Sequence, residues 1–371
     1  MAKLISADLT NNKLCILEYA TTDGQMLSFD EDAFDAKIVS HTYTDIGKVI
    51  FDKHITGIGE RAFADCKSLT SVTIPDSVTT IGVEAFYWCT SLTSVAIPDS
   101  VTTIGGCAFR GCNILKEFKG KFAADGGRCL IIDGVLNAFA IGCGVTQYNI
   151  PDSVTTIGSG AFYSCRSLTS VTIPDSVTTI GIGAFHWCTS LTSVTIPDSV
   201  TTIGSVAFYS CRRLTSVTIP NSVTTIGNYA FSSCSSLTSV TIGNGVTTIG
   251  NDAFRGCSSL TSVTIPDSVT TIGSSAFSSC DSLTSVTIGD SVTTIGEMVF
   301  SWCKSLTSVT IGKSVSEIGT YAFKKCNINT IVCCPKIPPK INDSFDRFEN
   351  LIVPTGCEEA YANSDWGQYL E

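Results

Sequence analysis

The chain has 371 residues, of which only 15% are charged, and its net charge is −10. This composition argues against a nucleic-acid partner, because phosphate binding needs a cationic stripe, and no apolar run reaches the length of a membrane span. Residues 1–7 lack the apolar core of a signal peptide, so a cytoplasmic location stays open beside an exported one.

Residues 1–45 differ from the rest of the chain, and we interpret them as an N-terminal cap. Two strand-like segments, 13–19 and 25–29, flank the dipeptide Asp23-Gly24. Asp-Gly between such segments is typical of a β-hairpin turn. We therefore expect a hairpin that protects the first edge of the structure that follows.

Residues 46–327 repeat one 23-residue phrase, S-L-T-S-V-T-I-P-D-S-V-T-T-I-G-x-x-A-F-x-x-C-x. A fixed period of this length predicts a solenoid of stacked coils, each too small to fold alone. We expect a β-rich, curved, right-handed leucine-rich repeat array of about twelve coils, with a parallel sheet on its concave face. The coils begin at Ile46, Leu69, Leu92, Leu115, Val145, Leu168, Leu191, Leu214, Leu237, Leu260, Leu283 and Leu306.

Within one coil, alternate residues of a short strand face inward. In the second coil the predicted inward residues are Leu69, Val72, Ile74, Val78, Ile81, Ala85, Phe86 and Cys89. The residues between the inward ones, Ser71, Thr73 and Pro75, then face the concave side. This uniform polar face is interpreted either as a solvated Thr/Ser ladder or as a surface for an extended polypeptide or a repetitive polymer.

The repeat is interrupted once, by a 30-residue step from Leu115 to Val145. Two apolar runs within 116–144 flank Asp133-Gly134, which predicts an inserted hairpin. It either fills the convex side of one coil or forms an island specialised for binding.

Residues 328–371 are interpreted as a degenerate coil followed by a C-terminal cap. A proline-rich segment at 328–339 precedes a strand-like run at 351–353. A helix is expected over 357–363, and residues 366–370 close the chain.

The two residues before each repeat cysteine vary, and several of them are aromatic. Exposed Tyr and Trp are typical of binding surfaces, so this position is the predicted binding patch. The alternative is that the rings pack sideways on neighbouring coils and fill the convex face. The predicted patch, called the aromatic column below, consists of Tyr87, Trp88, Tyr163, His186, Trp187 and Tyr209.

An acidic ladder occupies another repeat position. Pro-Asp-Ser is typical of turns in which the aspartate accepts from backbone N–H groups just ahead of it. We interpret the aspartates as turn formers and predict no metal and no other cofactor, the alternative being calcium between stacked carboxylates. The ladder consists of Asp76, Asp99, Asp152, Asp175, Asp198, Asp267 and Asp290.

Eleven of the 18 cysteines recur once per coil, from Cys66 to Cys326. A buried thiol that acts as a small apolar group explains this period better than disulfides, which would pair only alternate gaps of an equivalent column. The chain contains no C-x-x-C motif, which argues against a zinc site.

No arrangement of catalytic residues emerges from the chain. The histidines, His41, His54 and His186, have neither a nucleophile beside them nor metal-ligand spacing. The Gly57-x-Gly59-x-x-Ala62 sequence is one instance of the repeat and not a dinucleotide fingerprint. The sequence therefore predicts a protein that is not an enzyme.

The phrases SLTSVTIPDSVTTIG and AFxxC, the segment RCLIIDGVLNAFA and the ending LIVPTGCEEAYANSDWGQY resemble the BspA-like, or Treponema pallidum type, leucine-rich repeat proteins. The resemblance covers nearly the whole chain. It implies a non-enzymatic adhesion protein at a bacterial cell surface or secreted. The implied partner is a host extracellular matrix protein, such as fibronectin or fibrinogen, or a microbial surface protein.

We expect a monomer without a membrane span that binds through the solenoid surface. Two alternative functions are an intracellular protein-interaction scaffold and a carbohydrate binder that uses the aromatic column. Exposure of Trp88 and Trp187 would favour the carbohydrate binder, and their burial against neighbouring coils would remove it.

Overall fold

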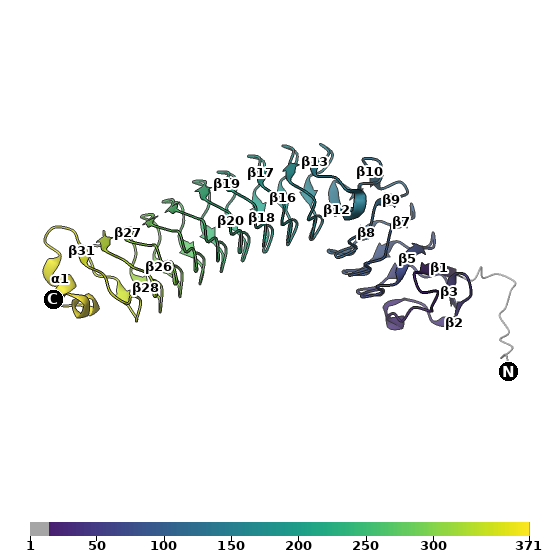
Figure 1. Cartoon of the computed structure of the whole chain (residues 1–371), viewed down its shortest axis with the longest axis horizontal. Helices are drawn as coiled ribbons and strands as arrows, with labels where there is room; N and C mark the ends of the chain where they lie inside the picture. Colours follow the sequence, from purple (N-terminus) through teal and green to yellow (C-terminus); the bar gives the residue numbers. More distant parts are fainter. Residues whose placement is uncertain (1–14, 371) are drawn as a thin grey trace. The chain divides into compact units, whose positions relative to one another are not determined.

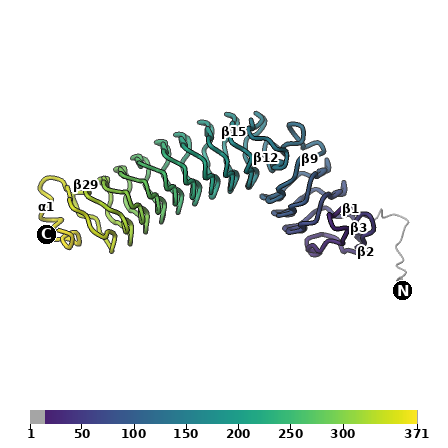
Figure 2. Tube along the Cα trace, viewed as in Figure 1, coloured from purple at the N-terminus to yellow at the C-terminus, as the bar shows by residue number. Residues whose placement is uncertain are grey.

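The structure is a computed structural model, and it describes residues 15–370. The chain divides into two compact units, Met1–Gly144 and Val145–Glu371. Each unit is a stack of coils, which appear in Figure 1 and in the chain trace of Figure 2 as successive turns of similar size. The predicted repeat solenoid with a parallel sheet is confirmed.

The first unit begins with an antiparallel sheet. Strand β1 (Cys15–Thr21) pairs with β3 (Gly47–Phe51), β3 also pairs with β2 (Ile38–Tyr43), and a short 3-10 helix, η1, covers Glu31–Ala33. The predicted hairpin between 13–19 and 25–29 is therefore wrong, and its residues 13 and 14 lie outside the described chain. In residues 15–19 and in residues 47–51, buried side chains alternate with more exposed ones. The buried residues of one strand therefore pair with the buried residues of the other. Residues 25–29 form no strand.

The coils of the first unit form two parallel ladders. The longer strands lie on one side and stack on β1, whereas the short strands pair on the other side. The longer strands are β5 (Leu69–Thr73), β7 (Ser94–Ala96) and β9 (Glu117–Lys119), and the short ones are β4 (Gly57–Ile58), β6 (Thr80–Ile81) and β8 (Thr103–Ile104).

The interruption of the repeat is a hairpin, as its sequence predicts. Strand β11 (Cys129–Ile132) pairs antiparallel with β12 (Val135–Phe139) and with β10 (Ala123–Ala124), and the 3-10 helix η2 (Ile141–Cys143) follows. The turn residues Asp133 and Gly134 have φ values of 48° and 76°. Two positive φ values in succession fit the Asp-Gly hairpin turn.

The second unit repeats the same coil more regularly. Most of its neighbouring strands pair in parallel with partners 23 residues away in the sequence, so that Val217 lies beside Val240 and Thr202 beside Thr225. The longer strands form three ladders, β13–β17, β19–β21 and β23–β31, whereas the short strands continue in one. The longer strands are β13 (Gln147–Asn149), β15 (Ser170–Thr172), β17 (Ser193–Thr195), β19 (Ser216–Ile219), β21 (Ser239–Ile242), β23 (Ser262–Ile265), β25 (Ser285–Ile288), β27 (Ser308–Ile311), β29 (Thr330–Cys333) and β31 (Asn350–Ile352). The short strands are β14 (Thr156–Ile157), β16 (Thr179–Ile180), β18 (Thr202–Ile203), β20 (Thr225–Ile226), β22 (Thr248–Ile249), β24 (Thr271–Ile272), β26 (Thr294–Ile295), β28 (Glu317–Ile318) and β30 (Lys340–Ile341).

The core of the second unit consists of identical side chains stacked coil on coil. The ring centroid of Phe208 lies 5.1 Å from that of Phe185 and 5.1 Å from that of Phe231, and all three rings are fully buried. Most coils also contribute buried Leu, Val, Ile and Ala residues at the predicted inward positions. No coil could bury these side chains without its neighbours, which is why the fold needs many copies.

The cysteine column is buried, as predicted, and its thiols have a second role. The thiol of Cys234 donates to the backbone oxygen of Phe208 in the preceding coil at 3.2 Å, and burial raises its pKa to about 12. The column thus joins consecutive coils while it fills the core. The same bond to a phenylalanine oxygen, at 3.1 to 3.4 Å, is made by Cys89, Cys112, Cys188, Cys211, Cys234, Cys257, Cys280, Cys303 and Cys326.

The chain ends in helix α1 (Glu358–Ala362) and the 3-10 helix η3 (Asp365–Tyr369), close to the predicted positions. Trp366 is fully buried, and its indole N–H donates to the backbone oxygen of Pro339 at 2.8 Å. These contacts close the last coil.

Within residues 15–370, no helix is long and apolar enough to cross a membrane. The cap boundaries at 45 and 328 stay a prediction.

Candidate binding surface

The longer strands of the second unit present an outward row of hydroxyl groups, called the strand face below. In β23, Val263 and Ile265 are 3% and 1% exposed, whereas Ser262 and Thr264 between them are exposed. Alternation along a pleated strand dictates this division. Ser71 and Thr73 are exposed in the same way in the first unit, and Pro75 is half-buried.

A shallow hollow of about 760 Å³ lies over the strand face of the second unit. It extends over four consecutive strands, β21, β23, β25 and β27. Its middle is lined by one threonine from each of them, Thr241, Thr264, Thr287 and Thr310. Because β23, β25 and β27 pair in one ladder, whose strands lie about 4.8 Å apart, the hydroxyl groups of Thr264, Thr287 and Thr310 form evenly spaced rungs.

Asp267 and Asp290 lie at one edge of the hollow. An oxygen of Asp267 accepts from the backbone N–H of Asp290 at 2.8 Å, and one of Asp290 accepts from that of Lys313 at 3.1 Å. The expectation that these carboxylates accept from groups just ahead in their own turn is therefore wrong here, because the donor lies one coil further on. Hydrogen bonds from the Lys313 side chain and backbone hold the pKa of Asp290 below its usual value.

Other hydroxyl groups make the strand face rigid. The side chain of Thr284 donates to the backbone oxygen of Thr261 at 3.0 Å, and Thr307 donates to Thr284 at 3.3 Å. Ser268, in the turn, donates to the backbone oxygen of Val246 at 2.8 Å. Each coil is thereby tied to the one before it, so the rungs of the hollow keep a fixed spacing.

The structure divides the aromatic column between the two units. Tyr87 and Trp88 belong to the first unit, where the guanidinium of Arg61 lies 5.2 Å from the Tyr87 ring centroid. Both rings are half-buried, and Trp88 packs over Gly111, where an added Cβ would come within 2.8 Å of the indole.

The other four members pack on one another in the second unit. The ring of His186 lies 5.1 Å from that of Tyr163 and 4.8 Å from that of Tyr209, and Trp187 lies 5.7 Å from Tyr163. Tyr163 is only 3% exposed, so the expectation of an exposed ring is wrong for this residue. His186, Trp187 and Tyr209 are half-buried. Sideways packing between coils, the alternative that the sequence left open, describes this cluster.

The most exposed aromatic residues lie elsewhere in the second unit. Trp302 is 50% exposed and Tyr321 is 41% exposed, and both have φ values near 60°. Trp302 occupies the same repeat position as Trp187, but the position just before it carries Ser278, Ser301 and Lys324 in successive coils, where the coils around Trp187 carry Tyr163, His186 and Tyr209. Sequence reasoning missed it because the prediction relied on clustered aromatics, which cover one another.

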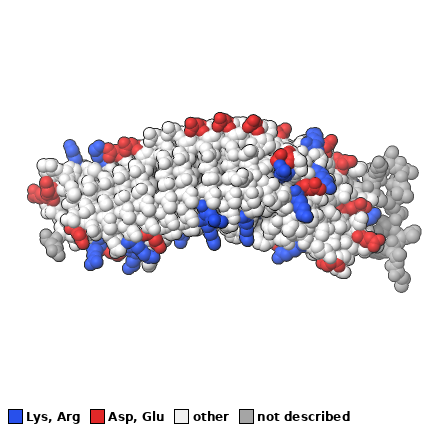
Figure 3. All heavy atoms as spheres, turned by 45° about the horizontal axis from the view of Figure 1, so that its top comes forward, with Lys and Arg blue, Asp and Glu red and all other residues white. Residues whose placement is uncertain are grey.

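Charge is sparse on this surface. In the view of Figure 3, uncharged side chains cover most of the visible surface, and charged ones lie mainly along its upper and lower margins and in a mixed group on the right. The strand face therefore offers hydroxyl groups and backbone to a partner, but few charges with which to form ion pairs.

Comparison with known families gives one match. The model described as "BspA type Leucine rich repeat region (6 copies)" matches residues 15–122, 136–257 and 224–352. No significant match was found among curated proteins.

Several solved structures are similar to this chain. A leucine-rich repeat protein from Eubacterium ventriosum is 24% identical over 74% of this chain and 75% of that chain, with a TM-score of 0.55. A leucine-rich cell surface protein from Faecalibacterium prausnitzii is 28% identical over 97% of both chains, with a TM-score of 0.46. A leucine-rich repeat protein from Bacteroides ovatus is 28% identical over 93% of this chain and 100% of that chain, with a TM-score of 0.44. The first of these supports the fold.

Proposed function

Because the chain belongs to the BspA-type leucine-rich repeat family, we propose that it is a non-enzymatic adhesion protein that holds a polypeptide partner along its strand face. The hollow over β21, β23, β25 and β27 carries this proposal. A leucine-rich repeat is a protein-interaction fold, and its stacked strands form extended binding surfaces.

The chemistry of the hollow suits an extended chain more than a compact ligand. Its threonine hydroxyl groups both donate and accept, so they can pair with backbone groups of a partner. The strand face lacks the aromatic and arginine anchors that dominate tight interfaces. Affinity would then come from many small contacts repeated along the coils.

We further propose a place and a partner for this activity. The family resemblance supports a bacterial cell surface or secreted location, with a host extracellular matrix protein or a microbial surface protein as the partner. An intracellular interaction scaffold would use the same strand face, and only the identity of the partner separates the two. The aromatic column is the alternative binding site, although the packing of its rings on one another weakens the carbohydrate-binding hypothesis.

The function is tested with purified protein on immobilised fibronectin, fibrinogen, mucins and glycans, measured by biolayer interferometry. We expect binding to at least one matrix protein, and we expect a Trp187→Ala/Tyr209→Ala variant to retain it. Loss of binding in that variant would instead assign the site to the aromatic column. A wild-type protein that binds glycans alone, or nothing on the panel, would contradict the proposal of a matrix-protein partner.

A further inference from the structure

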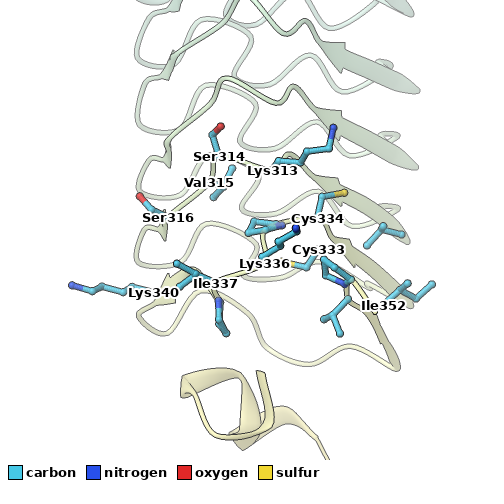
Figure 4. A pocket seen from close by; sticks show the side chains of 15 residues that line it. Lys313, Ser314, Val315, Ser316, Cys333, Cys334, Lys336, Ile337, Lys340 and Ile352 are labelled. Atoms are coloured by element: carbon cyan, nitrogen blue, oxygen red, sulfur yellow. The ribbon is translucent and has the colours of Figure 1, made fainter. Parts of the chain in front are cut away.

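An open groove of about 920 Å³ lies beside the last coils of the second unit (Figure 4). It is called the C-terminal groove below, and residues 313–316, 332–338, 340 and 352–354 line it. Three turns form its walls: the turn after β27, the segment between β29 and β30, and the residues after β31. In the segment between β29 and β30 the regular repeat phrase has been replaced by a proline-rich sequence.

The surface of the C-terminal groove is apolar and rigid. Pro335, Pro338 and Pro354 line it, and each proline fixes the backbone around it. Ile337 is 81% exposed and Ile352 is 53% exposed. Two exposed isoleucines on a proline-rich wall are typical of a surface that a partner covers.

The charge of the groove is opposite to that of the chain. Lysines line it at 313, 336 and 340, and none of its fifteen lining residues carries a carboxylate, although the whole chain has a net charge of −10. Lys313 follows Asp290 by one repeat of 23 residues, so the ladder that is acidic at Asp290 becomes basic at Lys313. In the next coil β29 pairs with β27 at an offset of 22 residues, so Pro335 takes the ladder position and Lys336 follows it directly.

The three lysines are not equally available to a ligand. The ammonium group of Lys313 donates to Asp290 at 2.5 Å, and Lys340 lies in register beside Glu317 of β28. Lys336 is exposed, and Figure 4 places its side chain in the middle of the labelled residues, whereas Lys340 extends outward. Lys336 is consequently the main cation that the groove offers.

The groove and the strand-face hollow are continuous. Cys334 lines both of them, and the Asp290–Lys313 ion pair lies where they meet. A chain that lies across the rungs of Thr287 and Thr310 would therefore reach the groove without leaving the surface. This continuity favours a polypeptide over a small molecule as the occupant.

We propose that the C-terminal groove binds an extended acidic segment of a polypeptide, in which an apolar side chain lies between carboxylates. The apolar side chain packs on Ile337 and the prolines, and the carboxylates pair with Lys336 and Lys340. The polypeptide is the partner that the proposed function places on the strand face, so this inference rests on that function. Charge complementarity of this kind supplies specificity more than affinity.

The test uses three fluorescent twelve-residue peptides and the full chain, with binding measured by fluorescence anisotropy. The first peptide alternates glutamate with leucine, the second replaces its glutamates by lysines, and the third replaces its leucines by serines. We expect only the first to bind. We expect Lys336→Glu and Ile337→Ser each to weaken it about fivefold or more, because both side chains are exposed and contribute to the groove alone.

Lys325→Glu is the matched control, since it makes the same charge change outside the groove, and it should leave the affinity unchanged. Equal binding of the lysine peptide, unchanged affinity of Lys336→Glu, or binding of a fatty carboxylate without the peptide would overturn the proposal. The peptide measurement needs no matrix protein. If a matrix protein binds but the acidic peptide neither binds nor competes with it, the groove proposal fails while the adhesion proposal stands.

Discussion

Replacement of Phe208 by alanine should lower the free energy of unfolding by about 3–5 kcal/mol. The ring is fully buried and stacked between Phe185 and Phe231, with centroids 5.1 Å away on both sides. Its removal leaves a cavity in the middle of a column whose backbone is held by the strands on either side, so the neighbours cannot collapse into it. Equilibrium urea unfolding followed by circular dichroism measures the loss.

Thr218→Ala provides the control for this prediction. Thr218 lies in the same coil, within β19, and its side chain is exposed. The Thr218→Ala substitution should change the free energy of unfolding by less than about 0.5 kcal/mol. If the two variants unfold at the same urea concentration as the wild type, the stacked phenylalanine rings, here called the phenylalanine column, do not form the core.

Removal of the Trp366 side chain should have an effect of similar size, about 3–5 kcal/mol. Trp366 is fully buried, donates its indole N–H to Pro339 at 2.8 Å, and lies 5.5 Å from the ring of Phe345. It covers the last member of the phenylalanine column. In the Trp366→Ala variant we expect a lower unfolding midpoint and, because an apolar edge is uncovered, increased binding of a hydrophobic dye.

The chain contains its own control for the loss of a tryptophan. Trp302 is 50% exposed, so Trp302→Ala should leave the midpoint nearly unchanged and should not increase dye binding. Equal destabilisation by the two substitutions would show that Trp366 does not act as a cap.

Much of this fold could be predicted from local sequence. The alternation in S-V-T-I assigns Val217 to the core and Thr218 to the surface, because a pleated strand has a period of two. Asp133-Gly134 predicts its hairpin because the turn itself requires two residues with positive φ. These features depend only on residues that are near one another in the chain.

Features that depend on distant pairing were harder to predict. Asp23-Gly24 indicates a turn but does not identify the strands that pair with β1, which are β3 and β5. Likewise, the sequence marks Tyr163 as aromatic, but its exposure depends on His186 and Trp187 one coil away. The C-terminal groove could not be predicted at all, because its walls come from three separate turns.

The central claim is that a partner binds along the strand face of the second unit. It is tested most directly by titrating the bound matrix protein against two double variants. Thr264→Arg/Thr287→Arg fills the hollow, whereas Thr271→Arg/Thr294→Arg adds the same side chains to exposed positions of β24 and β26 in the same two coils. We predict at least about a tenfold loss of affinity for the first pair and none for the second. Unchanged affinity of the first pair, or an equal loss in both, would contradict the account.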